Sequence, residues 1–199
     1  DGMTMWCAIR TYAAHADELG NKRQTSPVFF VKPEACLTEG AIDVTRHPGE
    51  IHHEVELVLR LDEGLHVDGI AVGLDLTDRA AQQAARPDGL PWARGKAFIG
   101  AARLGPFVPW DSDMEGLSRL HLELRIDGEL RQQAALSSMS ITPQALLSEL
   151  QSWAPLMGGD LVFTGTPSGV GQLLPGQHVS AVLCDGEGTV LSSLELDCC

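Results

Sequence analysis

Short stretches that alternate between hydrophobic and polar residues recur along the chain and predict a fold built mainly from strands. The predicted strands are residues 5–9, 28–31, 51–59, 69–76, 120–126, 129–133, 161–164, 179–184 and 190–196. Asp127-Gly128 separates two of them and is typical of a β-hairpin turn. Helical periodicity is confined to residues 12–19, 77–85 and 143–153. The pattern therefore predicts a β-rich α+β fold with few short helices.

The predicted strand at residues 51–59 carries two carboxylates two positions apart. Alternate side chains of a strand share a face, so Leu57 and Leu59 would face a core. Glu54 and Glu56 would lie side by side on the opposite face. Adjacent carboxylates repel one another unless a cation lies between them, and hard divalent cations prefer oxygen ligands. A solvated polar face is the alternative, and it is the commoner outcome for two glutamates alone.

Asp75 is a candidate for a third ligand of such a cation. It lies at the end of the predicted strand 69–76, on the side away from the core. Asp75 could instead start the helix that follows, but Asp78 is the better N-cap. Asp75 is then free to add an oxygen beside Glu54 and Glu56, which leaves positions on the ion for water and substrate.

Three further residues are candidates for binding an anionic substrate. Arg79 and Gln82 are three positions apart, so they share a face near the N-terminus of the predicted helix, where anions are favoured. Exposure to solvent is the alternative for both. Lys96 is flanked by small and apolar residues. It either extends to the surface or faces a substrate carboxylate or a developing enolate.

Two other patterns could carry chemistry. His15 and Glu18 are three apart on the first predicted helix, where the carboxylate could raise the basicity of the imidazole, although such spacing is common by chance. The glycine-rich run at residues 164–171 follows a strand and could present backbone N–H groups to a carboxylate. A tight turn is the alternative, and the run lacks the lysine of a nucleotide-binding loop.

Composition narrows the possible partners and the compartment. The chain has 199 residues, enough for one domain, and a formal net charge of −13, which argues against nucleic acid and anionic membranes as partners. The sequence shows no apolar run long enough to span a bilayer and no signal-peptide pattern. The five cysteines include no C-x-x-C pair. This pattern favours a reducing compartment, so we expect a cytoplasmic protein.

Taken together, these segments resemble the fumarylacetoacetate hydrolase family, and most closely its single-domain branch of acylpyruvate hydrolases, oxaloacetate decarboxylases and hydroxyheptadienedioate isomerases. The resemblance covers nearly the whole chain in one order. Its most specific runs are H-H-E-V-E-L at residues 52–57 and T-G-T-P-S-G-V-G at 164–171. The other matching runs are residues 12–15, 27–33, 74–79, 89–92, 96–98, 127–132 and 159–163.

The resemblance implies a role for each candidate residue. The metal ligands, for Mg²⁺ or Mn²⁺, would be Glu54, Glu56 and Asp75. The substrate-binding residues would be Arg79, Gln82, Gly165 and Thr166. The catalytic residues would be Lys96 and a lid base, His15, with its partner Glu18.

The resemblance also implies an architecture. We expect a rolled, barrel-like mixed sheet in a single structural domain. Residues 1–50 would form an N-terminal strand, a lid helix and a connecting segment, and residues 51–199 the catalytic core. A homodimer is the expected assembly, because it is usual in the family.

The first functional expectation is metal-dependent hydrolysis of a C–C bond in an acylpyruvate such as fumarylpyruvate, with His15 activating water and pyruvate released. The alternatives use the same metal and the same pyruvate enolate. They are decarboxylation of oxaloacetate and isomerisation or tautomerisation of a 2-oxo-enoic diacid. A non-catalytic relative is a further alternative, because Ile9-Arg10-Thr11 replaces the usual G-x-N before Tyr12.

Overall fold

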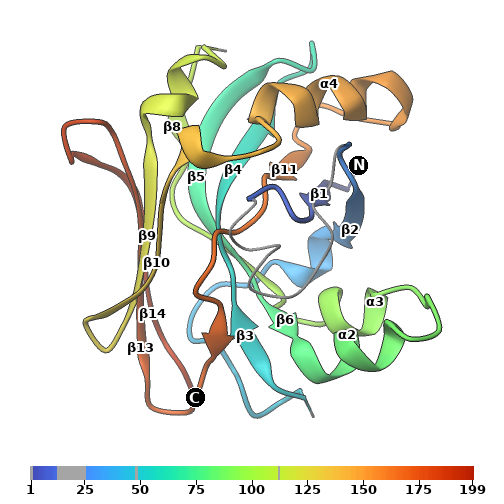
Figure 1. Cartoon of the computed structure of the whole chain (residues 1–199), viewed down its shortest axis with the longest axis vertical. Helices are drawn as coiled ribbons and strands as arrows, with labels where there is room; N and C mark the ends of the chain where they lie inside the picture. Colours follow the sequence, from blue (N-terminus) through green and yellow to red (C-terminus); the bar gives the residue numbers. More distant parts are fainter. Residues whose placement is uncertain (1, 13–25, 48, 112) are drawn as a thin grey trace.

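The chain forms a curled mixed sheet, half of a barrel, with a second sheet packed against it (Figure 1). The computed structural model describes residues 2–12, 26–47, 49–111 and 113–199. The seven strands of the curled sheet are β2 (Phe29–Pro33), β1 (Thr4–Ala8), β11 (Leu161–Phe163), β4 (Val55–Leu61), β5 (Val67–Asp75), β7 (Ala102–Leu104) and β8 (Val108–Pro109), which pairs with β5. Strand β1 runs parallel to β11, and the other pairs of these strands are antiparallel.

The remaining strands form two smaller sheets. The four-stranded sheet is ordered β10 (Glu129–Ala135), β9 (His121–Ile126), β13 (His178–Cys184) and β14 (Val190–Asp197). The three-stranded sheet is ordered β12 (Gly171–Gln172), β3 (Ile51–His53) and β6 (Thr77–Asp78). In Figure 1 the four-stranded sheet lies to one side of β4 and β5, and the helices α2 (Arg79–Ala85) and α3 (Ala93–Lys96) lie to the other. The sequence therefore predicted the β-rich α+β class correctly.

Three α-helices occur in the described part of the chain: α2 (Arg79–Ala85), α3 (Ala93–Lys96) and α4 (Pro143–Trp153). Three single-turn 3₁₀ helices accompany them: Glu34–Cys36, Gly116–Arg119 and Leu136–Ser138. None of the α-helices in these ranges is long and apolar enough to cross a membrane. The helix predicted at residues 12–19 lies outside the described residues, apart from Tyr12.

The predicted strand 51–59 is two strands, β3 and β4, that meet at Glu54. The expectation of one core face and one polar face is also wrong for β4, because both of its faces are covered. Leu57 and Leu59 belong to the main hydrophobic cluster, whereas Val58 packs into a second cluster with Met5 and others. Glu56 is only 1% exposed, so a solvated polar face is excluded.

Local sequence rules predict several other elements well. Asp127 and Gly128 both have positive φ, as a two-residue hairpin turn requires. Helix α4 spans the predicted residues, and Thr142 caps it by accepting a hydrogen bond from the backbone N–H of Ala145. The helix predicted at 77–85 is shorter, because Thr77 and Asp78 pair with β3 and Asp78 then caps α2, as expected.

The N-terminal segment is part of the same sheet as the core strands. Strand β1 pairs with β11 on one side and with β2 on the other, so β2 lies at one edge of the curled sheet. The division at residue 50 remains a prediction, but both sides of it contribute strands to one sheet. This arrangement brings Lys32 of β2 into contact with Asp75 at the end of β5.

The larger hydrophobic cluster of the described residues contains side chains from both the curled and the four-stranded sheet. We expect Leu59→Ala to lower the free energy of unfolding by about 2–5 kcal/mol, because Leu59 is fully buried in β4 and its truncation leaves a cavity. Urea denaturation measures the change. Leu130→Ala is the matched control, since Leu130 is 45% exposed on β10, and an equal loss in both variants would contradict this view of the core.

Candidate metal and substrate site

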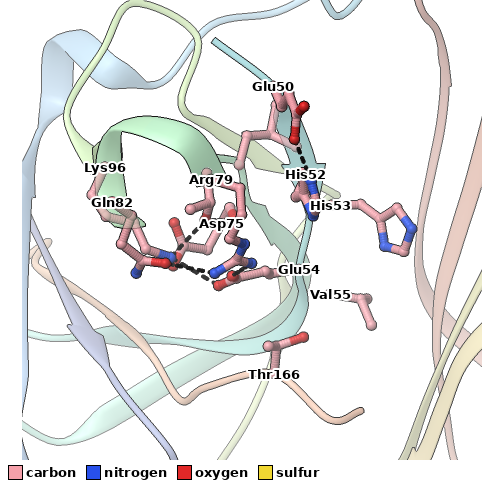
Figure 2. Close-up of polar contacts among 12 residues, drawn as sticks. Glu50, His52, His53, Glu54, Val55, Asp75, Arg79, Gln82, Lys96 and Thr166 are labelled. Carbon is pink, nitrogen blue, oxygen red and sulfur yellow. Dashed lines mark hydrogen bonds and ion pairs between the residues drawn. The ribbon is translucent and has the colours of Figure 1, made fainter. Parts of the chain in front are cut away.

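The three carboxylates predicted from the sequence lie together. Glu54 occupies the break between β3 and β4, Glu56 is the second residue of β4, and Asp75 ends β5. The backbone N–H of Asp75 donates to the carbonyl of Glu54 at 2.9 Å, which aligns the two chain segments. One ligand oxygen from each residue lies within 4.8 Å of the others, and all three residues are buried. Figure 2 shows Glu54 and Asp75 pointing toward the same space.

The electrostatics of this cluster fit a divalent cation. Burial raises the pKa of Glu56 well above its usual value, and Asp75 and Glu54 raise it further. The backbone N–H of Gly165 donates to Glu56 Oε2 at 2.7 Å and opposes that shift. An all-oxygen set of buried carboxylates is the donor set that hard cations such as Mg²⁺ or Mn²⁺ prefer. The chain therefore has an acidic site that suits a divalent metal.

Lys96 reaches the carboxylates from the end of α3. Its Nζ lies 2.8 Å from Glu54 Oε2, 2.6 Å from Asp75 Oδ2 and 2.6 Å from Thr77 Oγ1. Burial lowers the pKa of Lys96, but Asp75 and Glu54 outweigh it and raise the pKa overall. The two carboxylates therefore favour the protonated form of Lys96, and with 2% of its surface exposed it is not a surface lysine.

Arg79 and Gln82 lie together on the first turn of α2, as predicted. Arg79 Nη2 lies 2.5 Å from Glu54 Oε1, and Arg79 Nη1 donates to Gln82 Oε1 at 2.6 Å. Both side chains are buried, so the alternative of solvent exposure is excluded. Both line one cavity together with Lys96 and the three carboxylates. Figure 2 shows them beside Lys96, Glu54 and Asp75.

The glycine-rich loop after β11 supports the site from the other side. Gly165 has φ +97°, and a Cβ there would lie 2.1 Å from Thr11 Oγ1, so no side chain fits. Thr11 Oγ1 donates to the carbonyl of Thr164 at 2.7 Å and fixes the same turn. The backbone N–H of Gly165 thus donates a hydrogen bond to Glu56, while the next residue, Thr166, lines the cavity. The loop is both a tight turn and a wall of the site.

Sequence reasoning missed four residues at this site. Lys32 is completely buried in β2, and its Nζ lies 2.5 Å from Asp75 Oδ1 and donates to the carbonyl of Leu76 at 3.0 Å. Arg10 and Arg86 line the cavity, and Gln132 contacts Thr166 from the second sheet. A lysine inside the apolar run F-F-V-K-P was the one available signal for Lys32.

The predicted catalytic pair, His15 and Glu18, falls within residues 13–25, outside the described part of the chain. Their role as base and partner remains a prediction. The nearby Arg10 and Thr11 are described, and they reach the cavity and the loop at Gly165, respectively. The altered Ile9-Arg10-Thr11 segment therefore belongs to the wall of the site.

Comparisons with known proteins agree with this geometry. The family described as fumarylacetoacetate (FAA) hydrolase C-terminal matches residues 4–194. A rice protein named oxaloacetate tautomerase FAHD2, mitochondrial, is 38% identical over 187 residues, which cover 86% of this chain and 82% of that protein. A Dictyostelium discoideum protein named oxaloacetate decarboxylase, mitochondrial, is 34% identical over 183 residues. This alignment covers 85% of this chain and 84% of that protein.

A solved structure shows the same fold. The crystal structure of fumarylpyruvate hydrolase from Pseudomonas aeruginosa, in complex with Mn²⁺ and pyruvate, aligns with a TM-score of 0.87 and 33% identity. The alignment covers 98% of this chain and 88% of that one. Fold, acidic site and sequence agree, and the chain belongs to the fumarylacetoacetate hydrolase family.

Proposed function

We propose that this chain is a divalent-metal-dependent oxaloacetate tautomerase, which interconverts the keto and enol forms of oxaloacetate. Glu54, Glu56 and Asp75 would bind the ion, Mg²⁺ or Mn²⁺. From the sequence we expected acylpyruvate hydrolysis first and oxaloacetate chemistry second. The names of the rice and Dictyostelium relatives support the reverse order.

The observation that carries the proposal is the balance of charge in the cavity. Three cations, Lys32, Arg79 and Lys96, form ion pairs with Glu54 and Asp75 and balance the three carboxylates in number. A bound divalent ion would add two positive charges. Two more guanidinium groups line the cavity, so it would hold a surplus of positive charge and suit an anionic ligand, and oxaloacetate carries two carboxylates.

Those two guanidinium groups belong to Arg10 and Arg86, and neither forms a salt bridge with an acidic side chain among the described residues. Burial lowers the pKa of Arg86, the charges of Arg10 and Arg79 lower it further, and Glu54 only partly opposes the shift. The Nε of Arg86 is buried and makes no hydrogen bond with the described protein. Arg10 has φ +57°, an uncommon conformation for an arginine. An anion between these side chains would relieve their repulsion, and the distal carboxylate of the substrate would supply it.

The residues of the chain would divide the work of tautomerisation. The metal, when bound, supplies Lewis-acid polarisation of the 2-oxo group. A proton must leave C3 of oxaloacetate, and a proton must reach the 2-oxo oxygen. The ammonium group of Lys96 would stabilise the negative charge that develops on the substrate. His15, with Glu18, is the proposed base.

Acylpyruvate hydrolysis is the second candidate, and a separate observation favours it. An apolar cavity lined by Val28, Phe29, Phe30 and Leu90 adjoins the metal cavity, and both are lined by Ile9 and Trp92. The acyl group of an acylpyruvate would fit such a cavity. The name of the Pseudomonas relative also supports this candidate. Decarboxylation of oxaloacetate would require the same charge stabilisation and is supported by the Dictyostelium relative.

An absorbance assay of the Mg²⁺-loaded protein separates these reactions. We expect rapid, EDTA-sensitive equilibration of the oxaloacetate enol band without release of pyruvate. Pyruvate formed from oxaloacetate would identify a decarboxylase. Loss of the diketo band of acetylpyruvate with stoichiometric pyruvate would identify a hydrolase, and no effect on any substrate would overturn the proposal.

Removal of one ligand tests the metal site directly. We expect Glu56→Gln to weaken Mn²⁺ binding by at least about 10–100-fold, because an amide supplies a neutral oxygen in place of a charged one. Isothermal titration calorimetry measures the affinity. Glu50→Gln is the control, because Glu50 is exposed beside β3, and it should bind Mn²⁺ like the wild type. Equal affinities in all three proteins would exclude Glu56 as a ligand.

If Arg86 binds the distal carboxylate, its loss should weaken the binding of oxaloacetate but not that of pyruvate. We expect Arg86→Gln to raise the KM for oxaloacetate by about 10–100-fold, the amount that a lost charged hydrogen bond gives. The affinity for pyruvate, which lacks the distal carboxylate, should change little. Arg94→Gln, an exposed arginine on α3, serves as the charge-matched control. A parallel loss for both ligands would rule out a distal carboxylate site at Arg86.

A further inference from the structure

Gln132 is a buried polar residue on a strand that is otherwise mostly exposed. It lies in β10 of the four-stranded sheet, where most of the neighbouring side chains face solvent, and it is 1% exposed. The register of β10 with β9 shifts between Leu130 and Gln132. A β-bulge of this kind redirects a side chain, and bulges are frequent beside active sites. Here the side chain of Gln132 points out of its own sheet and contacts the wall of the metal cavity at Thr166.

All four hydrogen-bonding positions of the Gln132 amide are used. Its Oε1 accepts from the backbone N–H of Val55 at 3.1 Å and lies 2.9 Å from His53 Nδ1. Its Nε2 donates to Thr166 Oγ1 at 2.8 Å and to the carbonyl of Pro167 at 2.9 Å. A backbone N–H can only donate and a carbonyl can only accept, so Val55 and Pro167 leave the amide one orientation.

This orientation determines the role of the Thr166 hydroxyl. A hydroxyl has one proton, and Thr166 Oγ1 already accepts from Gln132, so its own O–H must point elsewhere. Thr166 lines the cavity that holds the three carboxylates, and its O–H has no acceptor among the described residues. Within the described part of the chain, the proton is thus available to a ligand in the cavity.

We propose that Gln132 is a positioning residue that holds the Thr166 hydroxyl as a hydrogen-bond donor to the carboxylate of a bound 2-oxo acid. This rests on the proposed function only in assuming that the cavity binds a 2-oxo acid beside the metal. Gln132 itself does not line the cavity, whereas Thr166 does. It also fixes Val55, the residue between Glu54 and Glu56, so one amide links the metal-binding strand to the substrate-binding loop.

The test measures pyruvate binding to the Mn²⁺-loaded protein by calorimetry, so it needs no turnover. In Gln132→Glu the new carboxylate can only accept, and the Thr166 hydroxyl would turn to donate to it. We expect pyruvate affinity to fall about 10-fold or more, with Mn²⁺ affinity unchanged. Thr166→Val should give the same loss, Thr166→Ser should keep the affinity, and the double variant should bind no worse than Thr166→Val alone.

Gln133→Glu is the matched control, because Gln133 is exposed on the same strand and its change adds the same charge. Additive losses in the double variant, or unchanged binding in Gln132→Glu, would overturn the proposal. If Gln132→Glu does not fold, unchanged pyruvate binding by Thr166→Val would overturn it equally. A wild-type protein that binds Mn²⁺ but not pyruvate would overturn both this proposal and the proposed function. Pyruvate binding without oxaloacetate turnover would overturn the function alone.

Discussion

Compensation of buried negative charge is the constraint on which this structure depends. Three carboxylates at the ends of β4 and β5 are removed from water, and each would be costly there without a nearby cation. The cations come from three different elements: Lys32 from β2, Arg79 from α2 and Lys96 from α3. The site is complete only when the N-terminal strand, the curled sheet and the short helices are all in place. The geometry of the site therefore depends on the complete fold.

Local rules predicted the parts of the fold that depend on neighbouring residues. The hairpin at Asp127-Gly128, the cap at Asp78 and the helix that begins at Pro143 follow from φ preferences and side-chain capping within a few positions. The carboxylate pair was visible because two positions along a strand place side chains on one face. The burial of β4 on both faces was not visible, since it results from two hydrophobic clusters, formed by residues distant in sequence, that pack on either side of the sheet.

The missed site residues share a physical reason. Gln132 lies 34 residues from Thr166 and 79 from His53, and Lys32 lies more than 40 positions before Asp75. No periodicity along the chain connects such pairs, because the contacts exist only once the sheets have formed. The bulge at Leu130–Gln132 also breaks the alternation that would assign Gln132 a direction. Site residues that depend on long-range contacts or on irregular strands therefore could not be predicted from the sequence.

The apolar cavity beside the metal site has a consequence for how this protein could diverge. Val28 and Leu90, which line it, lie outside the strands and helices that carry the three carboxylates and their cations. They are also 38% and 55% exposed, so replacing them costs little packing energy. Mutations could reshape this cavity without disturbing the charged cluster. Descendants of one ancestral chain could thus acquire new substrates through changes in the apolar cavity, while the residues of the charged cluster stay the same.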